Sequence, residues 1–376
     1  MITPFSIQIA QETLDDLKAR LKNTKWPDEI EGSKWEYGTN LTYIKELTDY
    51  WANTFNWRVV ENEINAYPNF IANIDGYKIH FLHIKGKGNK SIPLLISHGW
   101  PGSFIEMIKL IPLLTSDPDF SFDVVIPSVI GFGFSDKITH KGANSEFVAD
   151  IWHKLMLELG YPKYGAQGGD IGSGISTWLA LKHPNAIIGL HLNYISGSYR
   201  PYLKEGELLS EEALEFIKNA TDWYAAEGGY SHMHATKPLT LAYGLTDSPV
   251  GLCAWILEKF NSWSDHNETI ENVFTKQELL ANITLYWCTQ TIHSSIRIYN
   301  ENRKNPHIFK KDDFVQVPVG YAKFPKEIST PPRSYIEKGF NIQHWTEMNV
   351  GGHFAAMEQP SLLAADITAF FKTIAI

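Results

Sequence analysis

Apolar side chains recur at helical spacing in the first part of the chain. Leu14, Leu17 and Leu21 are three or four residues apart, and a longer apolar stripe runs from Leu41 to Phe55. Residues three and four apart lie on one face of a helix, so this spacing predicts amphipathic helices. We therefore expect residues 1–90 to form a mostly helical segment that packs on the core.

Short apolar runs typical of β-strands begin near residue 77. These runs cover residues 77–84, 92–97, 123–127, 164–167 and 187–195. Residues 148–159, between two of the runs, again show helical spacing. Alternation of strands and helices favours an α/β fold, in which a mostly parallel sheet carries helices on both faces. Residues 91–195 are expected to form the first part of this core.

Strand signals disappear from the sequence over residues 196–305. Ser210 and Ser248 each precede a helical pattern, and Thr275 with Glu278 forms the capping box of a third helix. A helical insertion between two core strands predicts a lid over the carboxyl edge of the sheet.

The third lid helix is expected to be long, with Ile292, Ile296 and Tyr299 on one face that looks toward this edge. Residues 306–376 then complete the core. Their expected elements are strands at residues 315–319 and 344–350 and a final amphipathic helix at residues 360–374.

The sequence Gly-Gly-Asp-Ile-Gly-Ser at residues 168–173 is typical of a nucleophile elbow, with Asp170 in the place usually held by serine. The strand at residues 164–167 leads into it, and a helix at residues 174–182 leads out. A carboxylate at this position indicates displacement at a saturated carbon, through an alkyl-enzyme ester that water then hydrolyses. Taken alone, the hexapeptide is equally compatible with an aspartate that caps a helix beside a glycine-rich turn.

Two residues downstream complete the chain order nucleophile, acid, histidine. His353 lies in a glycine-flanked loop before the final helix, and Glu327 follows a predicted strand 26 residues earlier. A single histidine among 14 is more often structural than catalytic. Three such residues in this order, each in a loop, favour His353 as the base and Glu327 as the carboxylate that orients it.

The loop at residues 98–103, His-Gly-Trp-Pro-Gly-Ser, follows a buried strand. A turn in this place can direct backbone N–H groups at an oxyanion. The two expected donors are the N–H groups of Trp100 and of Ile171, the residue after the nucleophile. The alternative is an ordinary turn at the end of a strand.

Further motifs match one known family in chain order. They are Trp26-Pro27, residues 35–38, Tyr50-Trp51, residues 55–58, Ile74-Asp75-Gly76, Ile79-His80-Phe81, the loop at 98–103, residues 131–135, the Asp170 elbow, Gly229-Tyr230, Thr236-Lys237-Pro238, residues 247–251, Leu285-Tyr286-Trp287, Phe324-Pro325 with Glu327, and residues 351–356. With these motifs the chain resembles the microsomal-type epoxide hydrolases, including the insect juvenile-hormone enzymes, over nearly its whole length.

The resemblance implies an α/β-hydrolase core with a helical lid, an Asp nucleophile, an acid and a His base. It also implies two lid tyrosines that hydrogen-bond the epoxide oxygen, which match Tyr230 and Tyr299 in this sequence. The chain departs from the family at Ile171, where tryptophan is frequent, and in the apolar N-terminal anchor of the membrane members. We therefore expect a protein without a membrane anchor, located in the cytoplasm.

The expected reaction converts a small apolar epoxide and water into a vicinal diol, without a metal or an organic cofactor. The main alternative is a haloalkane dehalogenase, which uses the same triad but needs indole or amide N–H donors for the halide. A hydrolase scaffold that has lost catalysis and serves in binding is a second alternative. The set of nucleophile, acid, base and two tyrosines speaks against it.

The composition of the chain limits which classes of binding partner are expected. The formal net charge of −9 argues against nucleic acid or an anionic membrane surface. Hydrophobic residues make up 44% of the 376 residues, enough for a large core. Two cysteines do not indicate a disulfide framework, and the oligomeric state stays open.

Overall fold

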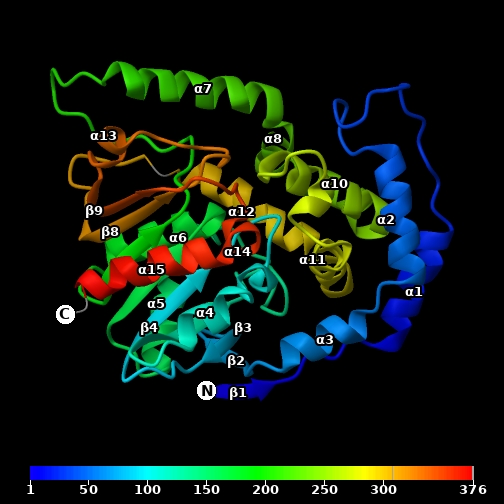
Figure 1. The fold of residues 1–376 in the computed structure, drawn as a ribbon, viewed down its shortest axis with the longest axis horizontal. Helices are drawn as coiled ribbons and strands as arrows, with labels where there is room; N and C mark the ends of the chain where they lie inside the picture. Colours follow the sequence, from blue (N-terminus) through cyan, green and yellow to red (C-terminus); the bar gives the residue numbers. More distant parts are fainter. Residues whose placement is uncertain (307, 375–376) are drawn as a thin grey trace.

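A nine-stranded sheet forms the centre of the described part of the protein (Figure 1). The computed structural model describes residues 1–306 and 308–374, so His307 and residues 375–376 of the predicted last segment lie outside the described residues. The strand order is β1-β2-β3-β5-β4-β6-β7-β8-β9. The strands are β1 (Ile2–Phe5), β2 (Asn69–Ile74), β3 (Tyr77–Ile84), β4 (Lys90–Ser97), β5 (Phe120–Pro127), β6 (Tyr164–Gly168), β7 (Ile187–Leu192), β8 (Val315–Lys323) and β9 (Phe340–Glu347).

Strands β5, β4, β6, β7, β8 and β9 are parallel to one another, whereas β1, β2 and β3 add an antiparallel edge. The carboxyl ends of parallel strands meet at one edge of a sheet. The residues that follow β4, β6, β7, β8 and β9 are therefore brought to the same side of the molecule. This includes every segment in which the sequence predicts a triad residue or an oxyanion donor.

Helices cover both faces of the sheet (Figure 1). Helices α4 and α15 pack together on one face, and α5 and α6 pack together on the other. These elements are α4 (Leu110–Thr115), α5 (Ser145–Glu158), α6 (Asp170–Lys182) and α15 (Pro360–Ile374), with the short helices η1 (Phe104–Met107), α13 (Arg333–Ile336) and α14 (Ala355–Glu358) in connecting segments. The predicted mostly parallel sheet with helices on both faces is confirmed.

A group of helices lies between β7 and β8 in the chain and covers the carboxyl edge of the sheet. Its members are α7 (Glu211–Glu227), α8 (Gly229–Thr236), α9 (Pro238–Asp247), α10 (Pro249–Trp263), η2 (Ile270–Asn272), α11 (Lys276–Thr289) and α12 (Ile292–Lys304). The caps predicted at Ser210, Ser248 and Thr275 each begin one of these helices.

The N-terminal helices α1 (Gln11–Lys22), α2 (Leu41–Asn53) and α3 (Trp57–Asn65) pack against α10 and α11. The buried indole N–H of Trp51 on α2 donates a 2.9 Å hydrogen bond to Thr284 on α11. The N-terminal segment is therefore joined to the helical insertion as well as to the sheet, which its strands β1 to β3 extend.

Two predicted helix boundaries are wrong. The expected long third lid helix is two helices, because Gln290 takes a left-handed conformation with φ of 52° and ends α11. The helix expected from residue 174 begins at Asp170, since the chain turns into α6 directly after β6. The sequence pattern also missed α8 and α9 as separate helices.

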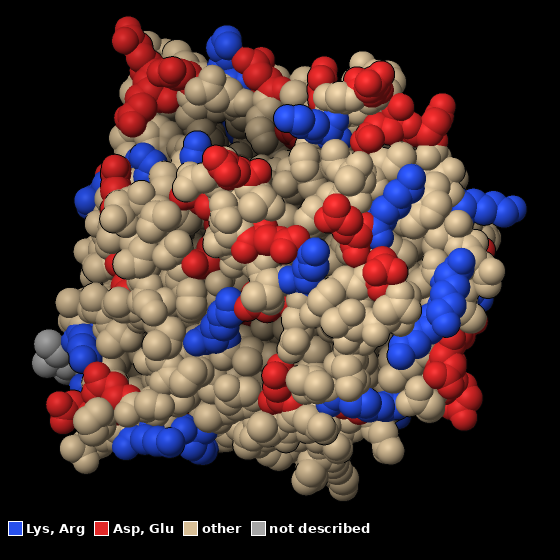
Figure 2. Space-filling model, turned by 45° about the vertical axis from the view of Figure 1, so that its right-hand side comes forward, with Lys and Arg blue, Asp and Glu red and all other residues tan. Residues whose placement is uncertain are grey.

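Acidic and basic side chains are interspersed over the face that Figure 2 shows. Helices long and apolar enough to cross a membrane were not found in the described part of the chain.

Candidate active site

Asp170 sits at a sharp turn between β6 and α6 and has a φ of 48°, in the left-handed region that few side chains adopt. The turn leaves no room for side chains beside it. A Cβ on Gly168 would lie 2.3 Å from the backbone oxygen of Gly172, and a Cβ on Gly172 would lie 2.0 Å from that of Ser97. This strained, crowded geometry holds the Asp170 carboxylate out at the sheet edge, as in a nucleophile elbow.

The loop after β4 approaches this carboxylate through its backbone. The N–H of Trp100 donates a 2.8 Å hydrogen bond to Oδ1 of Asp170. A Cβ on Gly99 would lie 2.1 Å from the same Oδ1, so glycine is needed for the approach. The N–H of Ile171 lies in the first turn of α6, where helix N–H groups have no partner within the helix. Both expected oxyanion donors therefore flank Asp170.

Helix α11 holds this loop from the lid side. Asn282 donates to the backbone oxygen of Pro101 at 2.8 Å, and Tyr286 donates to that of Gly102 at 2.7 Å. These bonds fix two carbonyl groups of the loop and so the orientation of the neighbouring Trp100 amide. Neither residue was singled out for this contact by the sequence.

His353 lies between two carboxylates. Its Nδ1 is 2.6 Å from Oε1 of Glu327, and its Nε2 is 3.4 Å from Oδ2 of Asp170. Both His353 and Glu327 are buried. Burial alone would lower the pKa of His353, but the negative charges of Glu327 and Asp170 raise that pKa well above its usual value. The three residues predicted as acid, base and nucleophile are thus brought into one line of contacts.

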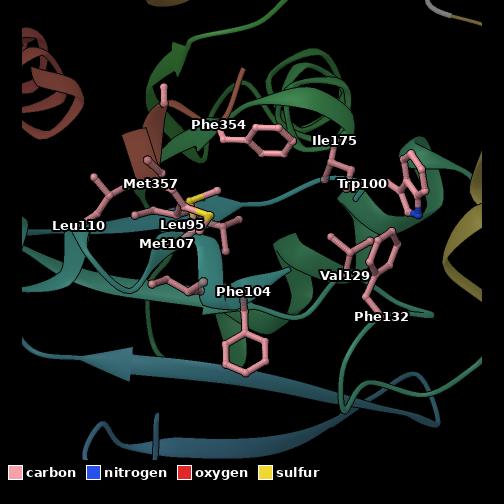
Figure 3. Packing of buried hydrophobic residues seen from close by; sticks show 14 of the residues in the cluster. Leu95, Trp100, Phe104, Met107, Leu110, Val129, Phe132, Ile175, Phe354 and Met357 are labelled. Atoms are coloured by element: carbon pink, nitrogen blue, oxygen red, sulfur yellow. The ribbon is translucent and has the colours of Figure 1, made fainter. Parts of the chain in front are cut away.

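The loop that carries His353 is held by hydrogen bonds on both sides. Glu358 accepts the N–H groups of Gly352 at 3.0 Å and of Phe354 at 2.8 Å, and the His353 N–H donates to the backbone oxygen of Trp263 at 2.9 Å. Apolar side chains pack close to this loop. Figure 3 shows Leu95 of β4, Met107 of η1 and Met357 of α14 lying close together, with Phe354 nearby.

Tyr230 on α8 and Tyr299 on α12 come together above the elbow, with ring centroids 6.1 Å apart. The Tyr230 ring stacks on Trp100 at 5.4 Å, and the Tyr299 ring meets Trp100 edge-on at 6.0 Å. Burial and the Asp170 carboxylate raise the pKa of both tyrosines well above 10. Both are therefore neutral phenols that can donate a hydrogen bond near Asp170.

The pocket at the site is lined by a residue that the sequence reasoning missed. Glu106 on η1 lines it together with Asp170 and His353. Burial raises the pKa of Glu106 to about 8, although the nearby His353 partly offsets this. Sequence alone gives little signal for Glu106, because it lies on a short 3₁₀ helix that the pattern does not predict.

Tyr194 and Trp263 also border the site. The ring of Tyr194, after β7, meets the His353 ring edge-on at 5.5 Å, and the Trp263 ring does so at 5.1 Å. Together with Trp100 and Phe354 they make the surroundings of the triad largely aromatic. Among the described residues there is no group of three or more His, Cys, Asp or Glu residues placed to hold a metal ion.

Comparison with known proteins agrees with this site. The family model "epoxide hydrolase N terminus" matches residues 2–107, and the model "alpha/beta hydrolase fold" matches residues 92–218. Epoxide hydrolase 1 of Sus scrofa is 39% identical, over 98% of this chain and 88% of its own. Juvenile hormone epoxide hydrolase 2 of Ctenocephalides felis is 38% identical, over 98% and 85%. The chain belongs to the epoxide hydrolase family.

Solved structures place this epoxide hydrolase in the same fold. Juvenile hormone epoxide hydrolase from the silkworm Bombyx mori superposes with a TM-score of 0.88 at 33% identity, covering 100% of this chain and 94% of its own. The epoxide hydrolase of Aspergillus niger gives a TM-score of 0.88 at 30% identity, with 100% and 97% covered. The predicted α/β-hydrolase fold and the resemblance to epoxide hydrolases are therefore confirmed.

Proposed function

We propose that this epoxide hydrolase opens a small apolar epoxide to a vicinal diol through a covalent ester on Asp170. The observation that carries the proposal is the line of contacts from Glu327 through His353 to Asp170, beneath two neutral tyrosines. The aromatic surroundings of the site favour an apolar substrate, because they offer dispersion contacts and few polar partners.

In the first half-reaction, Oδ2 of Asp170 attacks a ring carbon of the epoxide and the C–O bond breaks. The bonding electrons stay on the epoxide oxygen, which takes a proton or a strong hydrogen bond from Tyr230 and Tyr299. Oδ1 is the oxygen that accepts the Trp100 N–H, so it is the one that becomes the ester carbonyl. The product of this step is a hydroxyalkyl ester.

In the second half-reaction, water attacks the ester carbon of Asp170 while Nε2 of His353 takes its proton. Glu327 holds the imidazole in the tautomer that leaves Nε2 free to accept, and it stabilises the imidazolium that forms. The N–H groups of Trp100 and Ile171 bind the oxyanion of the tetrahedral intermediate. Collapse of this intermediate returns the proton to the leaving oxygen and releases the diol. The regenerated Asp170 carboxyl group then gives up its remaining proton, which restores the tyrosine that protonated the epoxide oxygen.

A single turnover in heavy-oxygen water tests the covalent route. Water attacks the carbon of the Asp170 carboxyl, so the label is expected in Asp170 after one turnover and in the diol only in later turnovers. Peptide mass analysis of the protein and of the diol measures both. Label in the diol of the first turnover would mean that water attacks the epoxide itself, and Asp170 would lose its role as nucleophile.

We further propose four functional segments, residues 1–90, 91–195, 196–305 and 306–376. The first supports the lid, the second and fourth form the hydrolase core, and the third is the lid. The position of α7 to α12 between β7 and β8 supports this division. So does the change of matching family model between residues 92 and 107.

A further inference from the structure

Lys259 on α10 is a charged residue in the interior of the lid. Its side chain is 6% exposed, although lysine is seldom buried in proteins without a specific partner. The ammonium lies 4.6 Å from the ring centroid of Tyr230 and 5.7 Å from that of Trp263. Its ion-pair partner is the adjacent Glu258, whose side chain is more exposed. A buried cation is therefore held on the face of one of the two lid tyrosines.

The groups around the Tyr230 hydroxyl otherwise oppose negative charge on it. After burial, the Asp170 carboxylate, Tyr194 and Glu258 each raise the pKa of Tyr230, while the hydrogen bond with Tyr299 lowers it. The same surroundings would resist the transfer of the Tyr230 proton to a substrate. A cation on the aromatic ring has the opposite effect, because it attracts the electron density that the phenol gains as its proton leaves.

We propose that Lys259 is a positioning residue for epoxide opening that acts through Tyr230. As the epoxide C–O bond breaks, the Tyr230 proton moves toward the epoxide oxygen and negative charge grows on the phenol oxygen and its ring. The Lys259 ammonium stabilises that charge in a dry site, where electrostatic interactions are strong. The inference rests on the proposed role of Tyr230 as proton donor.

The alternative is that Lys259 only fills space between Tyr230 and Trp263. Methionine at this position keeps an unbranched apolar stem of similar length and removes the charge, whereas arginine keeps the charge. Lys218 on α7 is exposed and paired with Asp222, so Lys218→Met is a matched control for loss of a lid lysine. Thermal unfolding of each variant verifies that it is folded.

Stopped-flow measurement of ester formation and of ester hydrolysis distinguishes a positioning role of Lys259 from a space-filling one. We expect Lys259→Met to slow ester formation about tenfold or more, the loss expected for a desolvated cation–π contact. Ester hydrolysis should be unchanged, because Tyr230 has no part in it, and Lys259→Arg should recover most of the rate. The deficit should also be larger for aliphatic epoxides than for epoxides with electron-withdrawing substituents, whose alkoxides need less acid assistance.

A double-mutant cycle with Tyr230→Phe tests the route of the effect. If Lys259 acts through the hydroxyl, Lys259→Met should have little further effect in the Tyr230→Phe background. An equal loss in both backgrounds, or in both half-reactions, would overturn the proposal. If Tyr230→Phe itself left ester formation at the parent rate, the proposed role of Tyr230 would fail instead.

Glu258→Gln gives an independent test that keeps the lysine. It removes the negative charge that partly neutralises Lys259 and that raises the pKa of Tyr230. Ester formation is therefore expected to become faster by a small factor, with ester hydrolysis unchanged. A slower ester formation in Glu258→Gln would contradict the proposal even if Lys259→Met did not fold.

Discussion

The two oxygens of the Asp170 carboxylate have different surroundings. Oδ1 accepts the Trp100 N–H at 2.8 Å, whereas Oδ2 faces Nε2 of His353 at 3.4 Å. In the proposed mechanism, Oδ2 is the oxygen that attacks and Oδ1 is the one that remains in the oxyanion site after the ester forms. His353 does not have to move to serve the hydrolysis of that ester, since it already lies on the side of Oδ2.

A change at His353 should separate the two half-reactions. His353→Gln leaves Asp170 able to attack but removes the base that activates water, so the ester should accumulate. Intact-mass analysis after addition of an epoxide should show a protein–substrate adduct in His353→Gln and none in His140→Gln, a change of an exposed histidine. Full turnover by His353→Gln would remove this residue from the mechanism. Glu327→Gln should be slow but active, because the base remains while its orientation is lost.

The raised pKa of Glu106 leads to a prediction about how the stability of the protein depends on pH. Its pKa is raised from an ordinary 4.5 to about 8 by burial, so the folded protein keeps a proton that the unfolded chain loses above pH 4.5. The stability linked to this proton is complete below pH 4.5 and is lost as the pH rises to about 8. Glu106→Gln removes the titration. The melting temperature of Glu106→Gln minus that of the parent should therefore become larger as the pH rises from 5 to 8.5.

The control for this experiment is Glu12→Gln, an exposed change on α1 that likewise removes one carboxyl group. A constant difference between Glu106→Gln and the parent across the same range would mean that Glu106 ionises normally in the folded protein.

Sequence patterns brought out the three residues of the proposed triad, which the structure places in contact, better than the other residues around them. Asp170, Glu327 and His353 have a fixed chain order, and each follows a strand. Glu106 and Lys259 carry no such order, because they reach the site through the packing of η1 and α10. Burial and proximity of this kind depend on the whole fold, so they could be read only from the structure.

At the scale of elements, the predicted and observed helices agree where the sequence signal is local. The capping box of Thr275 and Glu278 is present as predicted, and the last helix covers Pro360–Ile374 as expected. The break at Gln290 was missed because apolar residues continue at helical spacing from α11 into α12. A left-handed residue other than glycine leaves little trace in such a pattern, and the turn is held by hydrogen bonds of Gln290 and Thr291 to the end of α11.

Because of this break, α12 is a helix separate from α11. Together, α8 and α12 bring Tyr230 and Tyr299 over Asp170. Each single change to phenylalanine should slow ester formation about a hundredfold, the usual loss for one transition-state hydrogen bond, and the double change should be nearly inactive. Ester hydrolysis should change much less. Rapid-quench measurement of the ester with the single and double variants checks this.

If the double variant opened epoxides at close to the parent rate, the tyrosines would not be the acid. Release of halide from chloro- and bromoalkanes would then be the assay to perform, since a dehalogenase uses the same triad with different leaving-group donors. Parent and double variant should both fail that assay if the epoxide assignment is right.

At the scale of the whole molecule, the N-terminal helices and the site are connected through the lid. Helix α2 contacts α10 and α11, α10 carries Lys259 and Trp263, and α11 holds the loop of Trp100. Support from outside the lid thus reaches both Trp263, which contacts His353, and the loop of Trp100. The N-terminal segment is therefore linked to the site indirectly, through its contacts with α10 and α11.

The hydrogen bond between Trp51 and Thr284 allows this connection to be tested, because it joins α2 to α11 and both side chains are buried. Thr284→Val keeps the shape of the side chain but leaves the indole N–H without its acceptor, which typically costs about 1–3 kcal/mol. The free energy of unfolding from urea titration should fall by this amount. Thr221→Val on α7 is the control, since the Thr221 hydroxyl is exposed and bonds within its own helix. Because the contact lies away from the triad, ester formation at 25 °C should persist in Thr284→Val while its thermal inactivation becomes faster. An unfolding free energy equal to that of the parent would show that the N-terminal helices do not hold the lid through this bond.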